Sequence, residues 1–295
     1  MAKTPTQNLA KTSVQLTHPE RIYWPDDGVS KQDLVDYYAL AWSRMAPFVV
    51  DRPLALLRCP DGIKGPRFFQ KHAWKGINPH IEEIVDPENE GGEKLLRIKD
   101  FDGLVALVQS ASLEIHPWGT TTAHWEKPDM IIMDLDPGED VAWSAVIAAA
   151  KEIKERLQAL GLASFVKTSG GKGLHVVAPL KPKATWPDVK VAAEAIAEGM
   201  SADNPEKYLS VAAKAKRTGH IFIDYLRNGR GNTAVAPYST RARPGAAVSM
   251  PLAWDDLTDR TGPSSFKVKN AASRLDERSA DPWADFFEAA EPLKS

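Results

Sequence analysis

An apolar run in the middle of the chain ends in two carboxylates, in the sequence M-I-I-M-D-L-D-P-G from residue 130 to 138. The run predicts a buried strand, and side chains alternate between the faces of a strand, so Asp134 and Asp136 point the same way. Two like charges beside apolar residues are costly unless they are paired or bind a cation. The Asp-Pro-Gly turn is an alternative explanation for Asp136, but it leaves Asp134 unexplained. The fold must therefore bring the end of a buried strand to a charged site or a turn.

A third aspartate repeats this pattern, because Asp224 ends the apolar run I-F-I-D within a predicted strand at 219–226. Hard divalent cations prefer oxygen ligands, and two ions about 4 Å apart held by shared carboxylates are common in phosphoryl and nucleotidyl transfer. The three aspartates together indicate one metal site. Taken by itself, Asp224 is equally well explained by an ion pair with Arg227 or Arg230.

A glycine-rich segment, K-T-S-G-G-K-G-L-H from 167 to 175, joins two predicted strands. It matches neither G-x-x-x-x-G-K-[ST] nor G-x-G-x-x-G, and the following V-V-A-P-L favours a strand where both motifs require a helix. Successive small residues can turn backbone N–H groups toward an anion, to which Ser169, Lys172 and His175 would add a hydroxyl, a cation and an imidazole. The alternative is a simple glycine hairpin turn.

Two arginines and a histidine are further candidates for binding an anion. Arg241 and Arg243, in A-P-Y-S-T-R-A-R-P-G, share a face if that segment is extended. Guanidinium groups suit phosphate oxygens, although alternating arginines also occur on solvated strand faces. His116 shares the face of a predicted strand with Glu114 and Ser112, and a single histidine is more often structural than functional.

Basic and aromatic side chains alternate in C-P-D-G-I-K-G-P-R-F-F-Q-K-H-A-W-K-G, residues 59–76. Basic residues that follow a backbone and aromatic residues that stack on bases are the two parts of a nucleic-acid groove. The alternative is core aromatics flanked by solvated charges. The residues concerned are Lys64, Arg67, Phe68, Phe69, Lys71, Trp74 and Lys75.

Composition limits the classes of protein that remain. The chain has 295 residues and a formal net charge of −2, so a nucleic-acid surface must come from local clusters of Lys and Arg. The single cysteine, Cys59, excludes an internal disulfide and fits a reducing compartment. The N-terminus lacks an apolar signal region and no apolar run is long enough to span a membrane, which predicts a cytoplasmic protein.

Helices and strands interleave without the even spacing of a doubly wound sheet, so we predict a mixed α/β (α+β) fold with a central sheet. Helices are predicted at about 30–45, 143–160, 188–199 and 281–290, and further strands at 54–58 and 111–116. Residues 1–15 are polar and show no periodic pattern, which predicts a flexible tail or linker before one domain at 16–295.

In this order, D-L-D, S-G-G-K-G-L-H, the strand ending in Asp224 and the Arg241 segment resemble the archaeo-eukaryotic primase superfamily, and most closely the polymerase domains of bacterial ligase D in non-homologous end joining. The similarity runs from about residue 16 to 290. It implies a primase-like catalytic fold in which helices flank a central mixed β-sheet, two Mn²⁺ or Mg²⁺ ions, and addition of ribo- or deoxynucleotides with ribonucleotides preferred. No K-x-D-G motif of a ligase adenylate site occurs, so the chain resembles the polymerase module alone.

The resemblance also implies roles for individual residues. Asp134, Asp136 and Asp224 match the catalytic metal ligands. His116 matches a histidine near the incoming nucleotide, and the residues that match the triphosphate contacts are Ser169, Lys172, His175 and Arg241.

DNA contacts are implied in the same way. Arg21 and Lys31 match a pocket for the 5′-phosphate across a gap, and Phe68, Phe69 and Lys71 lie where the template is bound. Lys31 follows the capping-box-like Ser30 in S-K-Q-D, so it falls in the first turn of a helix, which favours an anion. The alternative is an ordinary exposed lysine.

The partners implied are DNA ends and gapped DNA, nucleoside triphosphates such as ATP and GTP, Ku-bound ends, and the linked ligase and nuclease modules of a longer enzyme. Two other functions use parts of the same pattern. A two-metal nuclease would need the aspartates without a triphosphate cradle, and a DNA-end-binding module would need the basic segments without the aspartates.

Overall fold

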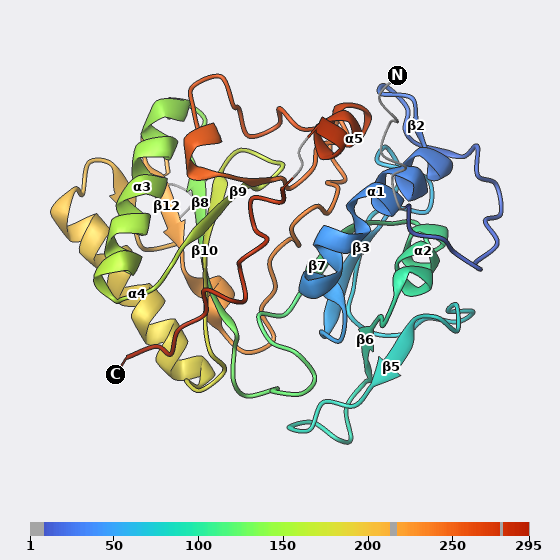
Figure 1. The fold of residues 1–295 in the computed structure, drawn as a ribbon, viewed down its shortest axis with the longest axis horizontal. Coiled ribbons are helices and arrows are strands. Elements are labelled where there is room, and N and C mark those ends of the chain that lie inside the picture. Colours follow the sequence, from blue (N-terminus) through green and yellow to red (C-terminus); the bar gives the residue numbers. More distant parts are fainter. Residues whose placement is uncertain (1–8, 213–216, 278–279, 295) are drawn as a thin grey trace, which may run out of the picture.

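A six-stranded mixed sheet forms one half of the computed structural model, which describes residues 9–212, 217–277 and 280–294 (Figure 1). The strand order is β11-β12-β8-β10-β9-β13, and only the β11–β12 pair is parallel. The long strand β8 and its neighbour β10 lie in the middle. The bounds are β8 Met130–Pro137, β9 Phe165–Thr168, β10 Leu174–Pro179, β11 Tyr208–Leu209, β12 Ile221–Asp224 and β13 Pro251–Leu252.

A second, five-stranded sheet forms the other half (Figure 1). Its path is β4-β3-β6-β5, and β7 pairs with β3. A separate hairpin, β1 with β2, precedes it in the chain. The bounds are β1 Ile22–Trp24, β2 Val29–Ser30, β3 Leu54–Arg58, β4 Phe68–Gln70, β5 Glu82–Ile84, β6 Leu95–Arg97 and β7 Ser112–Pro117.

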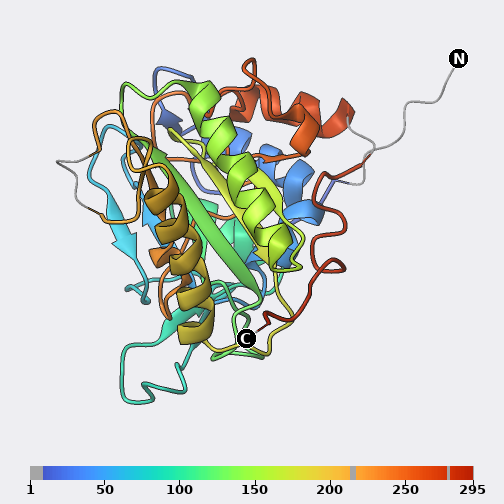
Figure 2. The same cartoon turned by 90° about the vertical axis from the view of Figure 1, so that its left-hand side faces the viewer.

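Helices flank both sheets. α3 and α4 lie side by side over one face of the six-stranded sheet (Figure 2), while α1, α2 and α5 accompany the other half. Ser30 caps α1 as expected, because its hydroxyl accepts from the Asp33 N–H at 3.1 Å and Asp33 accepts from the Ser30 N–H at 2.8 Å. The bounds are α1 Lys31–Val49, α2 Phe101–Gln109, α3 Trp143–Ala159, α4 Trp186–Asp203 and α5 Val268–Glu277, with short 3₁₀ helices at Leu226–Asn228 and Trp254–Asp256.

The alternation along β8 separates a core face from a charged face. Ile131, Met133 and Leu135 are buried in the main core cluster, to which α3 and α4 also contribute. Ile132 lies on the other face, in a separate cluster with Phe48 of α1. Asp134 and Asp136 share that second face, which is turned away from α3 and α4 and toward the other half of the molecule.

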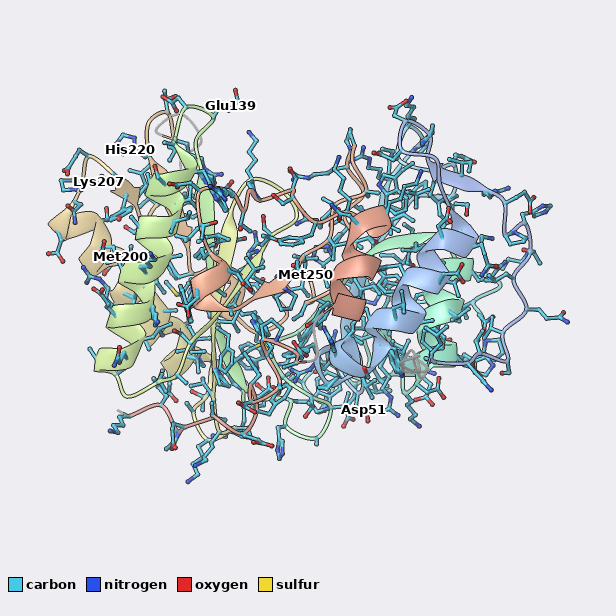
Figure 3. All side chains as sticks on the ribbon, turned by 45° about the horizontal axis from the view of Figure 1, so that its top comes forward. Asp51, Glu139, Met200, Lys207, His220 and Met250 are labelled. Carbon is cyan, nitrogen blue, oxygen red and sulfur yellow. The ribbon has the colours of Figure 1, made fainter. Side chains whose placement is uncertain are left out.

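The segment 233–250 links the two halves. On one side the Ala236 N–H donates to Ile115 O of β7 at 2.9 Å, and on the other the Thr168 N–H of β9 donates to Met250 O at 3.0 Å. Met250 lies between the two halves in Figure 3 and is 2% exposed. The charged face of β8 and the strand β7 are therefore held in a fixed relation by one buried segment.

Most of the predicted elements are present, but the last one is not a helix. Residues 282–289 form consecutive turns, in which Trp283 and Phe286 stack at 5.0 Å and both contact Phe48 and Phe165. The backbone here forms turn hydrogen bonds, such as that from the Phe286 N–H to Trp283 O at 3.0 Å, and not the continuous helix that the pattern at 281–290 predicted. No helix among the described residues is long and apolar enough to cross a membrane.

The segment predicted as a flexible tail lies partly outside the described residues, which begin at residue 9. The rest is held on α2, because the hydroxyls of Thr12 and Ser13 donate to the Asp102 carboxylate at 2.7 and 2.5 Å. Val14 also packs against the main core. Residues 12–14 are therefore attached to the domain, although most residues from 9 to 15 are exposed.

Candidate active site

Four ionisable side chains form a row across the six-stranded sheet. Asp134 on β8 pairs with Asp224 on β12 and, on its other side, with His175 on β10. His175 in turn pairs with Lys167 on β9. Directly paired residues share a face, so the row lies on the charged face of β8, and Asp136 extends it along the strand. The three predicted aspartates are thus brought together.

Two arginines neutralise this acidic cluster. Arg227 Nη2 lies 3.1 Å from Asp224 Oδ2 and 3.3 Å from Asp134 Oδ2. Arg217 forms an ion pair with Asp136, and its guanidinium lies over the Phe222 ring at 4.7 Å. The ion pair between Asp224 and Arg227, which was the alternative explanation for Asp224, is therefore present. The same arginine also contacts Asp134.

Burial raises the pKa of Asp134 to about 6. The charge of Arg227 acts in the opposite direction, and the negative charges of Asp224 and Asp136 add to the increase. The Asp134 carboxylate thus gains from any additional positive charge that approaches it.

The three aspartates have the ligand type that divalent cations prefer, since their carboxylates, from two neighbouring strands, supply hard oxygen ligands. Within the described residues, however, no group of three or more His, Cys, Asp or Glu side chains has the geometry of a ready-made metal site. The arginines explain this, because their guanidinium groups contact all three carboxylates. Metal binding stays a prediction, and it requires these arginines to move aside.

His175 and Lys167 are buried beside the aspartates. His175 Nε2 lies 3.4 Å from Asp134 Oδ1, and the side chain also lines the large cavity described below. Lys167 Nζ donates to Val235 O at 3.0 Å and to Ser249 Oγ at 2.7 Å. Burial lowers the pKa of both groups well below their usual values, and the positive charge of Lys167 adds to the effect on His175. His175 is consequently a neutral imidazole next to Asp134.

The glycine-rich segment makes a tight turn against β8. A Cβ on Gly173 would lie 1.7 Å from the carbonyl oxygen of Leu135, so this close approach requires glycine. Ser169 Oγ accepts hydrogen bonds from the N–H groups of Gly171 and Gly173, both at 3.2 Å. Two N–H groups that an anion-binding nest would use are therefore hydrogen-bonded within the turn. The positive charge beside this turn comes from side chains instead.

A cavity of about 850 Å³ is lined by Asp134 and Asp136 and by the basic side chains Lys172, Arg241 and Arg243, which we call the basic wall; Asp224 is not among its lining residues. Arg241 Nη1 donates to the Ser169 carbonyl at 2.5 Å, while Lys172 reaches Glu139 on the far rim at 3.2 Å. Glu139 and His220 project from loops at the same end of the molecule (Figure 3). Lining residues are Asp134–Asp140, Ser169, Gly171–Gly173, His175, Arg217, Thr218, Arg227, Arg241 and Arg243.

The segment 241–243 is not extended but makes a tight turn, because the Arg243 N–H donates to Arg241 O at 2.8 Å. The two arginines nevertheless line one cavity, with Arg243 exposed and Arg241 largely buried. Sequence reasoning gave no role to Arg217 or Lys167, whose partners lie far along the chain, and named Glu114 only as a neighbour of His116.

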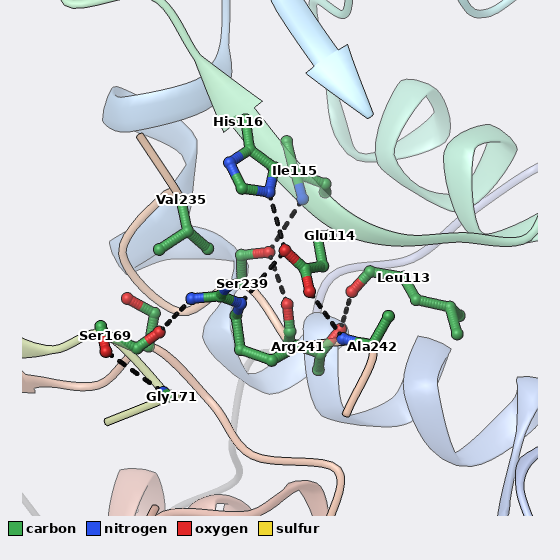
Figure 4. A network of polar contacts seen from close by, with 12 residues as sticks. Leu113, Glu114, Ile115, His116, Ser169, Gly171, Val235, Ser239, Arg241 and Ala242 are labelled. Atoms are coloured by element: carbon green, nitrogen blue, oxygen red, sulfur yellow. Dashed lines mark hydrogen bonds and ion pairs between the residues drawn. The ribbon is translucent and has the colours of Figure 1, made fainter. Parts of the chain in front are cut away.

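Glu114 and His116 of β7 face this site from the other sheet (Figure 4). His116 Nε2 lies 2.8 Å from Glu114 Oε2, and Arg241 Nε lies 3.1 Å from the same oxygen. His116 and Arg241, for both of which the resemblance implies a nucleotide contact, therefore share one partner. The remaining predicted cradle residue, Lys172, lies at the exposed mouth of the cavity.

Arg21 and Lys31 meet in a second, smaller cavity of about 180 Å³. Lys31 is 3% exposed, and its Nζ donates to Thr17 O at 2.6 Å and to Gln109 Oε1 at 3.2 Å. Arg58 lines the same cavity. Burial, and next the charge of Arg21, lower the pKa of Lys31. Lys31 is thus not an ordinary exposed lysine, and the cluster of three cations fits an anion.

The aromatic pair lies on β4, at the edge of the second sheet. Phe68 and Phe69 are 50% and 55% exposed, large values for neighbouring phenylalanines. The Phe69 ring meets the His116 ring edge-on at 5.7 Å, so this aromatic pair adjoins the predicted nucleotide contact His116. Lys71 follows and is exposed. Trp74 instead stacks under Arg58 at 3.9 Å.

Strand β1, together with a hydrogen bond at its end, connects the small cavity with the large one. Trp24 Nε1, at the end of β1, donates to Arg241 O at 3.2 Å. Arg21, immediately before the same strand, lines the small cavity.

Comparison with known proteins agrees with this architecture. A solved structure of the polymerase domain from Mycobacterium tuberculosis ligase D in complex with DNA superposes with a TM-score of 0.85 and 27% identity, covering 95% of this chain and 100% of that one. The mixed α/β fold is therefore that of a ligase D polymerase domain. Residues 30–283 match the model of the LigD primase-polymerase domain. The chain belongs to this family.

Two relatives show how the chain compares with longer proteins. It is 37% identical over 286 residues to the multifunctional non-homologous end joining protein LigD of Pseudomonas aeruginosa, covering 97% of this chain and 34% of that protein. It is 27% identical over 276 residues to the bifunctional non-homologous end joining protein LigD of Bacillus subtilis, covering 93% of this chain and 44% of that protein. The chain thus spans 34% of the first relative and 44% of the second.

Proposed function

We propose that this protein is a template-directed nucleotidyltransferase that fills gaps and extends DNA ends during bacterial non-homologous end joining. One observation carries the proposal: Asp134 and Asp136 share a single cavity of about 850 Å³ with the basic wall, and Asp224 lies directly beside Asp134 on the next strand. Such a cavity offers oxygen ligands on one side and phosphate-binding cations on the other. Substrates would be NTPs or dNTPs, including ATP and GTP, with ribonucleotides preferred as the family resemblance implies.

In the proposed reaction, the 3′-oxygen of a primer attacks the α-phosphorus of the nucleotide, the bond to the β-phosphate breaks, and pyrophosphate leaves. Asp134, Asp136 and Asp224 would hold two divalent cations, Mn²⁺ or Mg²⁺, which make the 3′-hydroxyl more acidic and neutralise the leaving group. Arg241 and Lys172 bind the triphosphate from the opposite wall. The arginines that now contact the aspartates would turn toward nucleic acid or triphosphate.

We place the DNA across the two cavities. The 5′-phosphate at the far side of a gap would bind Arg21 and Lys31, and template bases would stack on Phe68 and Phe69 while Lys71 contacts the backbone. The ligase D neighbour was solved with DNA, and several relatives are named as multifunctional end-joining proteins. We extend the proposal to DNA ends bound by Ku, to covalently linked ligase and nuclease modules, and to action at the nucleoid in the bacterial cytoplasm.

Primer extension tests this function. The protein, a primed template with a gap, Mn²⁺ or Mg²⁺, and each nucleotide class should yield a longer primer and pyrophosphate. Asp134→Ala, Asp136→Ala and Asp224→Ala should each abolish extension while leaving DNA binding intact. Shortening of the primer without dependence on nucleotide would identify a nuclease. DNA binding with no change in primer length would identify an end-binding module, and each result would overturn the proposal.

A further inference from the structure

Glu114 is a buried carboxylate that joins two residues of the nucleotide side of the site. Its Oε2 atom accepts a hydrogen bond from His116 Nε2 at 2.8 Å and lies 3.1 Å from Arg241 Nε (Figure 4). Its Oε1 atom accepts from the N–H of Ala242 at 2.9 Å. One side chain from β7 therefore contacts a ring, a guanidinium and the backbone next to that guanidinium.

The carboxylate stays ionised although its side chain is only 4% exposed. Burial raises the pKa of Glu114, but the His116 hydrogen bond, the Arg241 charge and the Ala242 N–H outweigh burial and hold this pKa at about 2. An ionised carboxylate can only accept hydrogen bonds. Each of its neighbours must therefore present a donor toward it.

This requirement fixes the tautomer of His116. Nε2 must carry a hydrogen to donate to Glu114, and the other ring nitrogen points away from the carboxylate (Figure 4). Burial lowers the pKa of His116, so the ring is neutral near pH 7. In the neutral ring Nδ1 is then an acceptor. It can receive a hydrogen bond from a hydroxyl group but cannot donate one to a phosphate.

The same carboxylate also fixes Arg241. The guanidinium is held at Nε by Glu114 and at Nη1 by the Ser169 carbonyl, 2.5 Å away. With the Ala242 N–H also bound to Glu114, both the side chain and the following backbone of Arg241 are anchored. Arg241 lines the large cavity, and among the described residues no hydrogen bond engages its Nη2.

We propose that Glu114 is a positioning residue for the nucleotide, which holds His116 in its Nε2–H tautomer and aims Arg241 at the triphosphate. The proposal rests on the proposed function and adds a residue to it. Glu114 itself touches neither nucleotide nor metal. It acts through two partners that approach the ligand differently, His116 as an acceptor and Arg241 as a cation.

Glu114→Gln is the informative variant, because it keeps the shape and removes one acceptor. A glutamine amide has a single oxygen, so it cannot serve the Ala242 N–H on one side and the His116–Arg241 pair on the other. If its oxygen faces Ala242, its NH₂ group faces His116, which must then accept and move its hydrogen to Nδ1. Glu82→Gln is the matched control, since Glu82 pairs with Arg97 and Lys99 far from the site.

The tautomer is read by ¹⁵N nuclear magnetic resonance of His116 without nucleotide. The unmodified protein should show Nε2–H, and Glu114→Gln should shift the ring toward Nδ1–H.

In primer extension, Glu114→Gln should raise the KM for the nucleotide about tenfold, with DNA affinity unchanged. This factor is at the lower end of the range for losing a charge-assisted hydrogen bond. In an Arg241→Ala background most of that increase should vanish, because the effect passes through Arg241. Glu82→Gln should change none of these values.

Two results would overturn the proposal: an Nδ1–H tautomer in the unmodified protein, which needs no variant to fold, or an unchanged KM in a folded Glu114→Gln variant. Failure of the proposed function looks different. In that case the unmodified protein extends no primer, while the His116 tautomer still reports whether Glu114 fixes the ring.

Discussion

Replacing Asp134 with asparagine should stabilise the protein in the absence of metal. The pKa of this carboxyl rises from 3.8 to about 6 on folding. Well below pH 3.8 the group is protonated in both the folded and the unfolded states, so it has no effect. Between these two pKa values the unfolded chain ionises first, so stability falls as pH rises and then stays lower. A difference of about two units corresponds to roughly 3 kcal/mol at neutral pH.

Asparagine cannot ionise, so Asp134→Asn should recover about 2–3 kcal/mol at pH 7.5. Arg227 keeps its other partner, Asp224, in this variant. Denaturation in chelator-treated buffer, measured between pH 3 and 8, should show two curves that approach each other toward pH 3, diverge between pH 4 and 6, and stay apart above pH 6. Asp136→Asn is the control, and it should give little gain because that side chain is 44% exposed.

Divalent cations provide a second arm of this experiment. If Asp134 is a metal ligand, millimolar Mn²⁺ should stabilise the unmodified protein and not Asp134→Asn, which narrows the difference between them. Parallel pH curves for the two proteins, or a variant less stable at pH 8, would refute the account of Asp134 as a destabilised charge.

Three further predictions follow from contacts described above. Gly173→Ala should destabilise the fold by at least about 3 kcal/mol in chemical denaturation, because its Cβ would overlap a β8 carbonyl, whereas Gly91→Ala, with open space around it, should be neutral. Arg241→Ala should weaken nucleotide binding by about 1.5–3 kcal/mol and leave DNA affinity unchanged, and an unaltered nucleotide affinity would place Arg241 outside the cradle. Fluorescence anisotropy should show tighter binding to gapped DNA with a 5′-phosphate than with a 5′-hydroxyl, a preference lost in the Arg21→Ala, Lys31→Ala double variant; equal affinities for the unmodified protein would rule the pocket out.

Local patterns were sufficient to predict the strand ends, since strand alternation places Asp134 and Asp136 together and glycine spacing marks the turn at 170–173. The arginines were not predictable in the same way. Arg217 reaches Asp136 from 81 residues away, and only the folded sheet shows that pairing. Arg227 was considered as a partner of Asp224, but its second contact with Asp134 depends on the register between β12 and β8.

The prediction of a helix at 281–290 was wrong, and the aromatic residues of this segment explain why. Trp283 Nε1 donates to Val166 O at 3.1 Å, and the ring packs against Phe48 and Phe165. Tertiary contacts of this size override a helical pattern in a short segment. The burial of Glu114 was likewise invisible in the sequence, because its three partners come from two segments more than a hundred residues apart.

The short strand β1 acts as a covalent spacer between the two cavities. Arg21 lines the small cavity just before this strand, and Trp24 at its end holds the Arg241 carbonyl. Three extended residues span about 10 Å, so the chain itself sets the separation of these two contacts. Inserting or deleting one residue here would shift one contact by about 3.3 Å and reverse the face of its side chain. Surface segments usually tolerate insertions and deletions. Between Arg21 and Trp24 we expect the protein not to tolerate them.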